Sequence, residues 1–393
     1  MTWVAHLVRT MDGRKGAQLD LAAPGSWSIP LNGIEDFSVA TSKTQLRRLE
    51  REWWSHMRTS VAVSWQHEDG TLDAWVAGPV MGPPAESETT ATLACRGIGA
   101  VLEKRVVLAQ EPVASPNDPQ IALMKSVVSL TGMSLGTIAQ EVVKHAVAKV
   151  GGTLPIVYGT PRETGATLNR RNYEGFNLSN NGAWKRLTEL TKVRNGTDIM
   201  FRPRWSDDGT HLEWVMVNGT AAQPQIAQGW TMDLDTTSTR SPISKVDVKT
   251  DAARIANRVY WTGAGEGAGI LARVVQDLSR LDDQMPLLEV VGSTSDSENG
   301  DLIRTHAEAE LAAARAPVTQ ISVKIDGADP RCQIGRWHVG DAANVTMGDD
   351  WLTVPKGTTP KRIIAAKGSW TSATVDLEFQ DDGPIEYEDE EVA

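Results

Sequence analysis

A glycine-rich loop between two short strand-like runs constrains the fold of this chain more than any other feature. The glycines at positions 263, 265, 267 and 269 alternate with other residues, after a run of β-branched and aromatic side chains at 258–262. Such a loop has two interpretations. It is either a phosphate-binding turn, which indicates a nucleotide-dependent enzyme, or the tip of a β-hairpin, which indicates a structural module.

The residues after the glycines separate these interpretations. A dinucleotide-binding turn requires a helix directly behind it, whose N-terminal amides bind the pyrophosphate. Residues 270–275 are instead few, rich in β-branched side chains and interrupted by Arg273, and a polar stretch follows them. We therefore predict that Gly263 and Gly265 lie between two antiparallel strands and bind no nucleotide. We expect no cofactor.

The charge balance restricts the kinds of partner. The 393 residues include 39 Lys and Arg against 50 Asp and Glu, for a net charge of −11. Tight binding to nucleic acid needs clustered basic side chains that displace counterions, so specific nucleic-acid binding is not expected. The most basic stretch, residues 43–58, also contains Glu50 and Glu52 and is predicted to be a solvated helix face.

Tryptophan is used far more than the other aromatic residues, with 14 Trp against 4 Phe and 4 Tyr. An indole suits both cores and interfaces, so we predict core packing for most of them and keep interface anchoring as the alternative for some. The two cysteines, Cys95 and Cys332, belong to no Cys-x-x-Cys pair and are predicted to be buried thiols. The seven histidines form no metal-binding pair at short spacing, so no metal site is expected.

The apolar runs are short throughout the chain. The N-terminus lacks the apolar core of a signal peptide. No run approaches the ~20 apolar residues of a membrane span. We therefore expect synthesis in a cytoplasm and no membrane anchor.

The N-terminal part, residues 1–110, is predicted to be mostly strands with one helix at 43–57. Period-2 alternation and β-branched residues recur there, which is typical of a small antiparallel barrel or sandwich. Residues 111–240 change character. Helical spacing at 135–150 and 183–193 is followed by a hairpin at 198–217, which indicates a mixed α+β domain.

Strand patterns return at residues 241–382, with one predicted helix at 301–314. Residues 383–393 are predicted to form an acidic, frayed C-terminal tail. The predicted fold class is therefore α+β, mainly β. Two small antiparallel barrel-like domains surround one mixed α+β domain.

One stretch matches an enzyme motif. Gly132-Met133-Ser134-Leu135-Gly136 fits the Gly-x-Ser-x-Gly nucleophile elbow, in which a serine sits on a sharp turn from a strand to a helix. Asp282 or Asp301, with His306, follow in the usual order of a catalytic triad. The competing interpretation is a helix N-cap, in which the serine oxygen accepts a first-turn amide. We favour the N-cap, because neither flank alternates strands and helices as a hydrolase sheet requires.

The acidic pairs of the chain also invite an acid–base interpretation. Two of them approach a glycine, which is typical of turns, and we expect a turn for the third as well. The pairs are Asp207-Asp208, Asp349-Asp350 and Asp381-Asp382. We predict no catalytic residue among them.

Several stretches, taken in order, resemble the minor tail proteins of long-tailed phages, especially those that infect actinobacteria. Residues 183–190 and 195–205 resemble that family's helix, Asn-Gly turn and hairpin. Residues 257–269 are similar to its strand and Gly-Glu-Gly loop. The helix at 301–314, with Val339-Gly340-Asp341 and Arg362-Ile363, resembles its C-terminal barrel.

The resemblance implies a tail hub at the distal end of a siphophage tail. In that family a trimeric ring supplies two barrel domains per subunit and docks on the distal tail ring or tube. The implied partners are a second and third copy, the distal tail protein, the tape measure protein and a tip or fibre protein. The implied action is to close the channel until host attachment and DNA ejection.

The same resemblance covers proteins of different length. Longer members continue into a hydrolase or fibre domain, whereas this chain ends at residue 393. We therefore expect a structural virion protein, assembled in the host cytoplasm and located at the tail tip, and not an enzyme. The alternatives are an envelope-degrading serine hydrolase that uses Ser134, and the hub of a contractile secretion-type spike.

Overall fold

A computed structural model gives the fold of most of the chain. It describes residues 2–22, 25–112, 117, 119–165, 168–193, 195–226, 230–279, 285–294, 299–315 and 317–381. Chain contacts divide the protein into two compact units. Unit 1 comprises residues 1–246, 323–346 and 358–380, and unit 2 comprises residues 247–322, 347–357 and 381–393. The domain boundaries expected at 110, 240 and 382 stay predictions.

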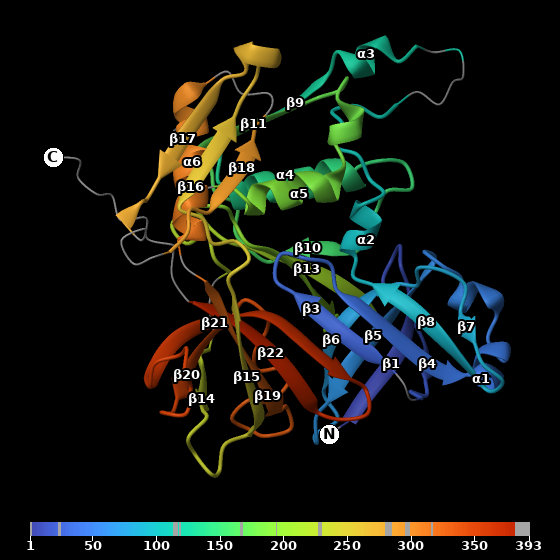
Figure 1. Cartoon of the computed structure of the whole chain (residues 1–393). Helices are drawn as coiled ribbons and strands as arrows, with labels where there is room; N and C mark the ends of the chain where they lie inside the picture. The colour runs from blue at the N-terminus through green and yellow to red at the C-terminus, as the bar shows by residue number, and fades with distance from the viewer. Residues whose placement is uncertain are drawn as a thin grey trace. The chain divides into compact units, whose positions relative to one another are not determined.

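Unit 1 begins with an antiparallel sheet in the order β2-β1-β5-β6 (Figure 1). Its strands are β1 (Thr2–Arg9), β2 (Lys15–Leu19), β5 (Thr59–Gln66) and β6 (Leu72–Pro79). The turn between β5 and β6 contains Gly70 at φ +85°, a left-handed conformation that glycine adopts without strain. The hairpin signal Glu68-Asp69-Gly70 therefore marks a real hairpin.

A larger sheet joins strands from both ends of the chain. Its main path runs β15-β19-β22-β21-β3-β4-β8-β7, and β20 connects β14 to β21. The N-terminal strands are β3 (Ser26–Pro30), β4 (Asp36–Ser42), β7 (Ala85–Glu86) and β8 (Thr90–Arg96). The later strands are β14 (Met232–Asp235), β15 (Ile243–Asp251), β19 (Val318–Asp326), β20 (Ala342–Met347), β21 (Gly357–Ser369) and β22 (Thr374–Asp381).

The connection between the two ends is the antiparallel pairing of β21 with β3. Trp27 lies opposite Gly368, where an added Cβ would stand 2.6 Å from the indole ring. The glycine thus leaves room for the tryptophan. The prediction of a mainly β fold with antiparallel sheets is confirmed, and strand pairing adds that the two β-rich ends share one sheet.

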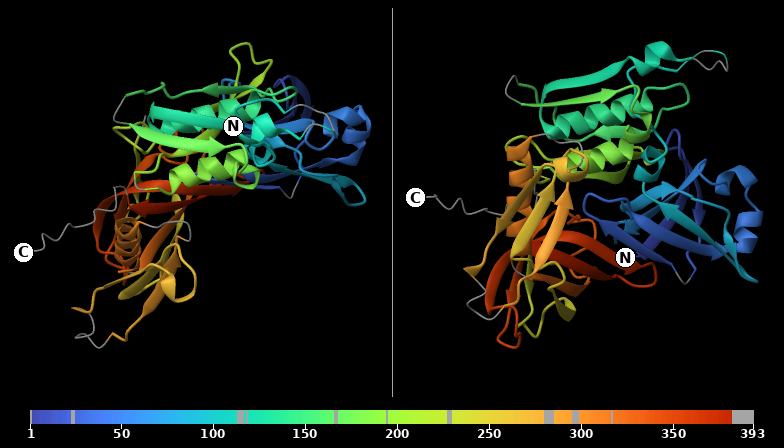
Figure 2. Two further views of the ribbon diagram at one scale, coloured as in Figure 1. Left: turned by 90° about the horizontal axis from the view of Figure 1, so that it is seen from above. Right: turned by 45° about the horizontal axis from the view of Figure 1, so that its top comes forward.

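The mixed α+β segment of unit 1 places two helices between small sheets. Its elements are α2 (Gly99–Leu102), α3 (Ile121–Met124), β9 (Val127–Met133), α4 (Leu135–Val147), β10 (Ile156–Tyr158), β11 (Asn169–Glu174), η2 (Leu178–Asn180), α5 (Ala183–Thr191), β12 (Ile199–Trp205) and β13 (Leu212–Asn218). Helices α4 and α5 lie side by side, under the β9–β11 ribbon (Figure 2). Both predicted helices and the predicted hairpin are present.

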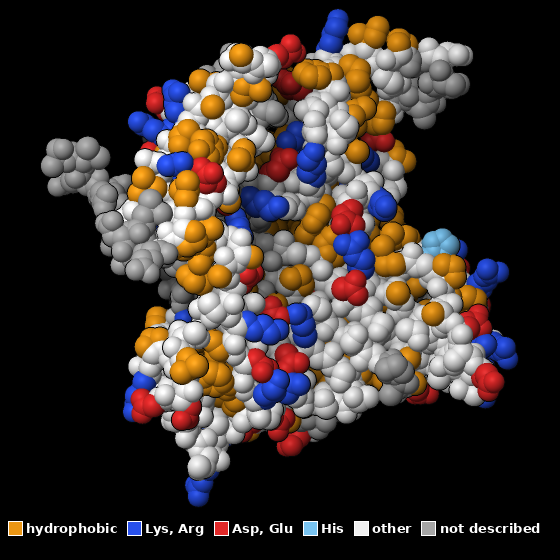
Figure 3. All heavy atoms as spheres, in the orientation of Figure 1, with side chains coloured by type: hydrophobic (Ala, Val, Ile, Leu, Met, Phe, Trp, Pro, Cys, Tyr) orange, Lys and Arg blue, Asp and Glu red, His pale blue; other side chains and the backbone are white. Residues whose placement is uncertain are grey.

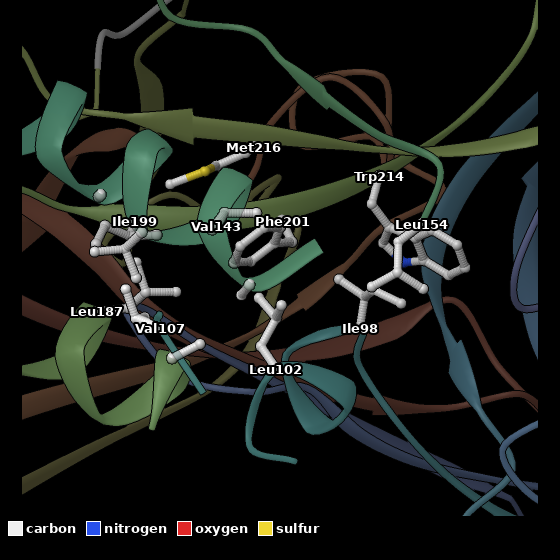
Figure 4. Close-up of a cluster of buried hydrophobic side chains, with 14 of the residues drawn as sticks. Ile98, Leu102, Val107, Val143, Leu154, Leu187, Ile199, Phe201, Trp214 and Met216 are labelled. Atoms are coloured by element: carbon white, nitrogen blue, oxygen red, sulfur yellow. The ribbon is translucent and has the colours of Figure 1, made fainter. Parts of the chain in front are cut away.

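A buried hydrophobic cluster fixes these elements to one another. Val143 of α4 packs in the same cluster as Phe201 of β12 and Met216 of β13 (Figure 4). Trp214 is fully buried there, and its indole N–H donates to the Ala77 carbonyl at 3.1 Å. At roughly 25 cal/mol per Å² of buried apolar surface, such a cluster contributes more than any surface ion pair.

The helix predicted at 43–57 is wrong in extent. The segment forms α1 (Lys43–Arg47) and a separate 3₁₀ turn, η1 (Arg51–Trp54). Only Leu46 of α1 is buried, so no apolar stripe supports a longer helix. Trp53 instead packs against Gly16, where a Cβ would stand 2.4 Å from its ring.

Unit 2 contains a three-stranded sheet with one helix on one face. Strand β16 (Arg258–Thr262) pairs antiparallel with β17 (Ala272–Gln276) and parallel with β18 (Glu289–Ser293). Helix α6 (Gly300–Ala314) contacts β16 and β17, and η3 (Gly267–Gly269) lies in the loop between these strands. The glycine-rich loop is therefore the tip of an antiparallel hairpin, as predicted. Gly265, at φ +132°, has the backbone of Gly269 where a Cβ would point.

Candidate functional site: a buried charged cluster

Ser134, the candidate nucleophile, is the N-cap of α4. Its Oγ accepts a hydrogen bond from the Thr137 amide at 3.1 Å and donates to Thr137 Oγ1 at 3.1 Å. The residue is only 1% exposed. Strand β9, which precedes it, pairs only with β11 in a two-stranded sheet. Both hydrogen-bonding functions of the hydroxyl are therefore used by the helix start, and the geometry supports capping.

The proposed triad partners have local roles of their own in unit 2. Asp282 lies outside the described residues. The His306 ring stacks on Trp261, with centroids 5.6 Å apart and an interplanar angle of 18°. Asp301 is exposed in the first turn of α6 and approaches Arg304 at 3.9 Å. The structure thus gives each described residue a structural neighbour.

The acidic pairs lie where the sequence places them. Asp208 accepts from the Thr210 amide at 3.0 Å in the β12–β13 turn, and this bonding and that of Ser206 hold its pKa at about 2. Asp349 and Asp350 also lie in a turn, and Asp382 is outside the described residues. Across the described residues, no group of three or more His, Cys, Asp or Glu side chains is arranged to hold a metal ion.

Both cysteine thiols are buried and unreactive by environment. Cys95 is 1% exposed and Cys332 is fully buried. Burial raises the pKa of both thiols, that of Cys332 to about 12. The prediction of buried, unpaired thiols is confirmed.

Charged side chains from distant parts of unit 1 meet in its interior. Arg362 of β21 forms a buried ion pair with Asp198, and its Nε donates to the Gly340 carbonyl at 2.9 Å. The two side chains are 3% and 9% exposed. Asn32 donates to Asp198 Oδ1 at 2.8 Å, and the Ile226 amide donates to Asp198 Oδ2 at 3.1 Å. The pair is therefore fully embedded in further hydrogen bonds, which a buried charge requires.

A second pair of charges adjoins the first along the loop before β20. Arg202 of β12 donates to the Val339 carbonyl at 3.3 Å and approaches Asp341 at 3.9 Å. Asp341 accepts from the His338 amide at 2.8 Å. Burial raises the pKa of Asp341 and lowers that of Arg202. The cluster thus joins the segment before β4, the strand β12, and the β20–β21 region.

Two further titratable groups lie beside Arg202. Burial raises the pKa of Glu35, which is 6% exposed, to about 7. Burial, with the nearby Arg202 guanidinium, lowers the pKa of His338 to about 3. Glu35 packs against Gly97, where a Cβ would stand 1.7 Å from Glu35 Oε2. Around pH 7 His338 is thus neutral and Glu35 is close to its titration midpoint.

Sequence reasoning did not single out this cluster as a site. Arg202, Asp341 and Arg362 fall within stretches that carry the resemblance, but Glu35 and Asp198 had no signal beyond a lone charge beside a strand. Lone charges next to strands are usually exposed. Only the tertiary fold brings these residues together.

The tryptophan excess is largely explained by one aromatic network. Trp3 contacts the rings of Trp65, Trp370 and Trp27 at centroid distances of 4.8, 5.2 and 6.1 Å. Trp75 then contacts Trp27 at 5.6 Å and Trp337 at 5.1 Å. Most of these contacts are edge-to-face, the geometry that aromatic rings prefer. The six residues are buried, so core packing is confirmed for them.

The other face of the unit 2 sheet is open. Val259 and Trp261 point toward α6, so Tyr260 and its cross-strand partners Val274 and Val291 point away from it. Val274 is 52% and Val291 73% exposed. Hydrophobic and charged side chains are mixed over these strands (Figure 3). Arg258 and Glu289 pair at 3.1 Å beside the apolar row.

The fold is that of known tail proteins. The chain is similar to the tail protein from Neisseria meningitidis MC58, with a TM-score of 0.55 and 15% identity over 98% of each chain. It is also similar to the 43 kDa tail protein of prophage MuSo2 from Shewanella oneidensis, with a TM-score of 0.54 and 12% identity over 96% of this chain and 98% of that one. No family model and no curated protein matches the sequence. Across the described residues, no helix is long and apolar enough to cross a membrane.

Proposed function

We propose that this protein is a structural component of a phage-type tail, and that it forms the trimeric tail hub at the distal end of a siphophage tail. The observation that carries the proposal is the likeness of fold to two tail proteins over nearly the whole of each chain. A match that spans both units favours a shared role more than a match to one sheet would, although fold alone does not fix function.

The interior of unit 1 supports a structural role. Its charged cluster is closed by internal hydrogen bonds, and its serine motif serves as a helix cap. Neither arrangement leaves a side chain poised for chemistry. The protein would join the distal tail ring or tube to the tip, contact the tape measure end, and keep the channel closed until host attachment.

Electron microscopy of purified particles, labelled with antibody against this chain, tests the proposal. We expect label at the distal tip of a long, non-contractile tail, with particles from a deletion strain lacking both label and tip density. Label on the head or along the shaft would refute a hub. Label at the tip of a contractile sheath would instead favour the hub of a contractile spike.

A further inference from the structure

A small cavity lies next to the charged cluster of unit 1. Glu35, Trp75, Arg202 and His338 line it, together with apolar side chains, and its volume is about 20 Å³. A water molecule needs ~10–15 Å³ of such space and two to four polar partners. The cavity is thus large enough for one water molecule and too small for an organic ligand.

Two hydrogen-bond donors in this lining are left without a partner. Trp75 Nε1 and Arg202 Nε are both inaccessible to solvent, and neither has a hydrogen-bond partner among the described residues. Trp75 is 6% exposed, and Glu35 beside it is 6% exposed as well. Buried polar atoms in native proteins nearly always have a partner, either protein or ordered water. Two orphan donors at one cavity therefore indicate an occupant that accepts.

The mixture of groups selects the occupant. A cation is disfavoured by the Arg202 guanidinium and by two N–H donors, which offer it no ligand. An anion is disfavoured by the buried Glu35 carboxyl. A neutral molecule that accepts twice and donates to a carboxyl oxygen fits all three groups, and water has this capacity.

We propose that the cavity binds an ordered water molecule that accepts from Trp75 Nε1 and Arg202 Nε and donates to the Glu35 carboxyl group. The water would bridge β6, β12 and the segment before β4. Arg202 already donates to Val339, so the bridge extends the charged cluster to the loop before β20. This inference concerns the interior of unit 1 and does not depend on the proposed function.

Nuclear magnetic resonance of the full chain tests the proposal. The indole N–H signals are resolved in a ¹⁵N correlation spectrum, and Trp75→Phe and Trp65→Phe assign two of them. Trp65 is the matched control, because its indole N–H is also buried and unpartnered in the described structure but lies outside the lining of this cavity. We expect cross-relaxation with water at the Trp75 indole proton and none at that of Trp65.

A crystal structure of the wild-type chain is the second measurement and does not depend on the folding of any variant. Density for water within about 3 Å of Trp75 Nε1, Arg202 Nε and a Glu35 oxygen is the expected result. A dry cavity would overturn the proposal. So would a Trp75 N–H directed at the Trp337 ring, or a direct bond from Arg202 Nε to Glu35.

Discussion

Single residues in this protein take their roles from burial. The Ser134 hydroxyl shows this, because its hydrogen bonds to Thr137 serve the first turn of α4. The same motif on an exposed elbow would present a nucleophile. Glu35 shows it for a charged group, since the same carboxyl in water would titrate near its ordinary value.

Ser134→Ala is expected to lower the free energy of unfolding by about 1 kcal/mol, because the first turn of α4 loses its cap. Denaturant unfolding measures the change. Ser134→Asn keeps a capping oxygen and should retain most of the stability. Labelling of the wild-type protein by a serine-reactive probe, lost in the alanine variant, would contradict the capping role and revive the hydrolase.

Glu35→Gln should change how stability depends on pH. The pKa of Glu35 is raised from 4.5 to about 7 in the folded protein. Between these values the folded state holds a proton that the unfolded chain releases, so its contribution to stability falls as pH rises through this window. The shift corresponds to about 3 kcal/mol at most. The glutamine variant is neutral throughout, so it should gain stability over wild type between pH 5 and pH 8.

Thermal unfolding of both proteins across that range provides the measurement. Burial lowers the pKa of His6 to about 4 and that of His338 to about 3, so both lose stability as pH falls below 6.5. That loss is common to both proteins and cancels in the difference. A difference that does not vary with pH would contradict the raised pKa of Glu35.

Arg362→Met should be strongly destabilising, because it leaves the Asp198 carboxylate buried without its cation. The expected loss in the free energy of unfolding is about 3–5 kcal/mol. The double variant with Asp198→Asn should recover part of it. Arg204→Met is the matched control, since the Arg204–Glu213 pair is 61% and 31% exposed and should contribute under about 1 kcal/mol. Equal losses for both single variants would contradict the burial argument.

At the scale of elements, regular patterns gave reliable predictions and short strands did not. The long amphipathic helix α4 and the hairpin β12–β13 carry their periodicity in their own residues. Strands β10, β14 and β18 are short and were not predicted. They exist because a longer neighbour offers hydrogen bonds, as β16 does for β18. That information lies in the partner strand.

The two faces of the unit 2 sheet should respond differently to a charge. Val259 is fully buried under α6, so Val259→Asp is expected to cost more than about 3 kcal/mol or to prevent folding of the unit. Val291→Asp lies on the open face and should change the free energy of unfolding by less than about 0.5 kcal/mol. Limited proteolysis and thermal unfolding compare the two. A large loss for Val291→Asp would show that its face is covered.

At the scale of the whole molecule, the proposed hub requires self-association. Closed threefold rings use two unlike surfaces of each subunit. We expect native mass measurement of the hub region isolated from particles to give three copies of the 42.6 kDa chain. A stable dimer or hexamer would contradict the proposed trimer. A recombinant monomer alone would not, because such rings can require their docking partner.

The sequence by itself determined the period-bearing elements, the hairpin at the glycine loop and the buried thiols. These depend on neighbouring residues, whose spacing and backbone preferences act locally. Only the tertiary structure decided that β21 pairs with β3, that Arg362 meets Asp198, and that Glu35 and Trp75 share a cavity. Those contacts join residues far apart in the chain. Their energies come from desolvation and packing, which exist only once the segments have met.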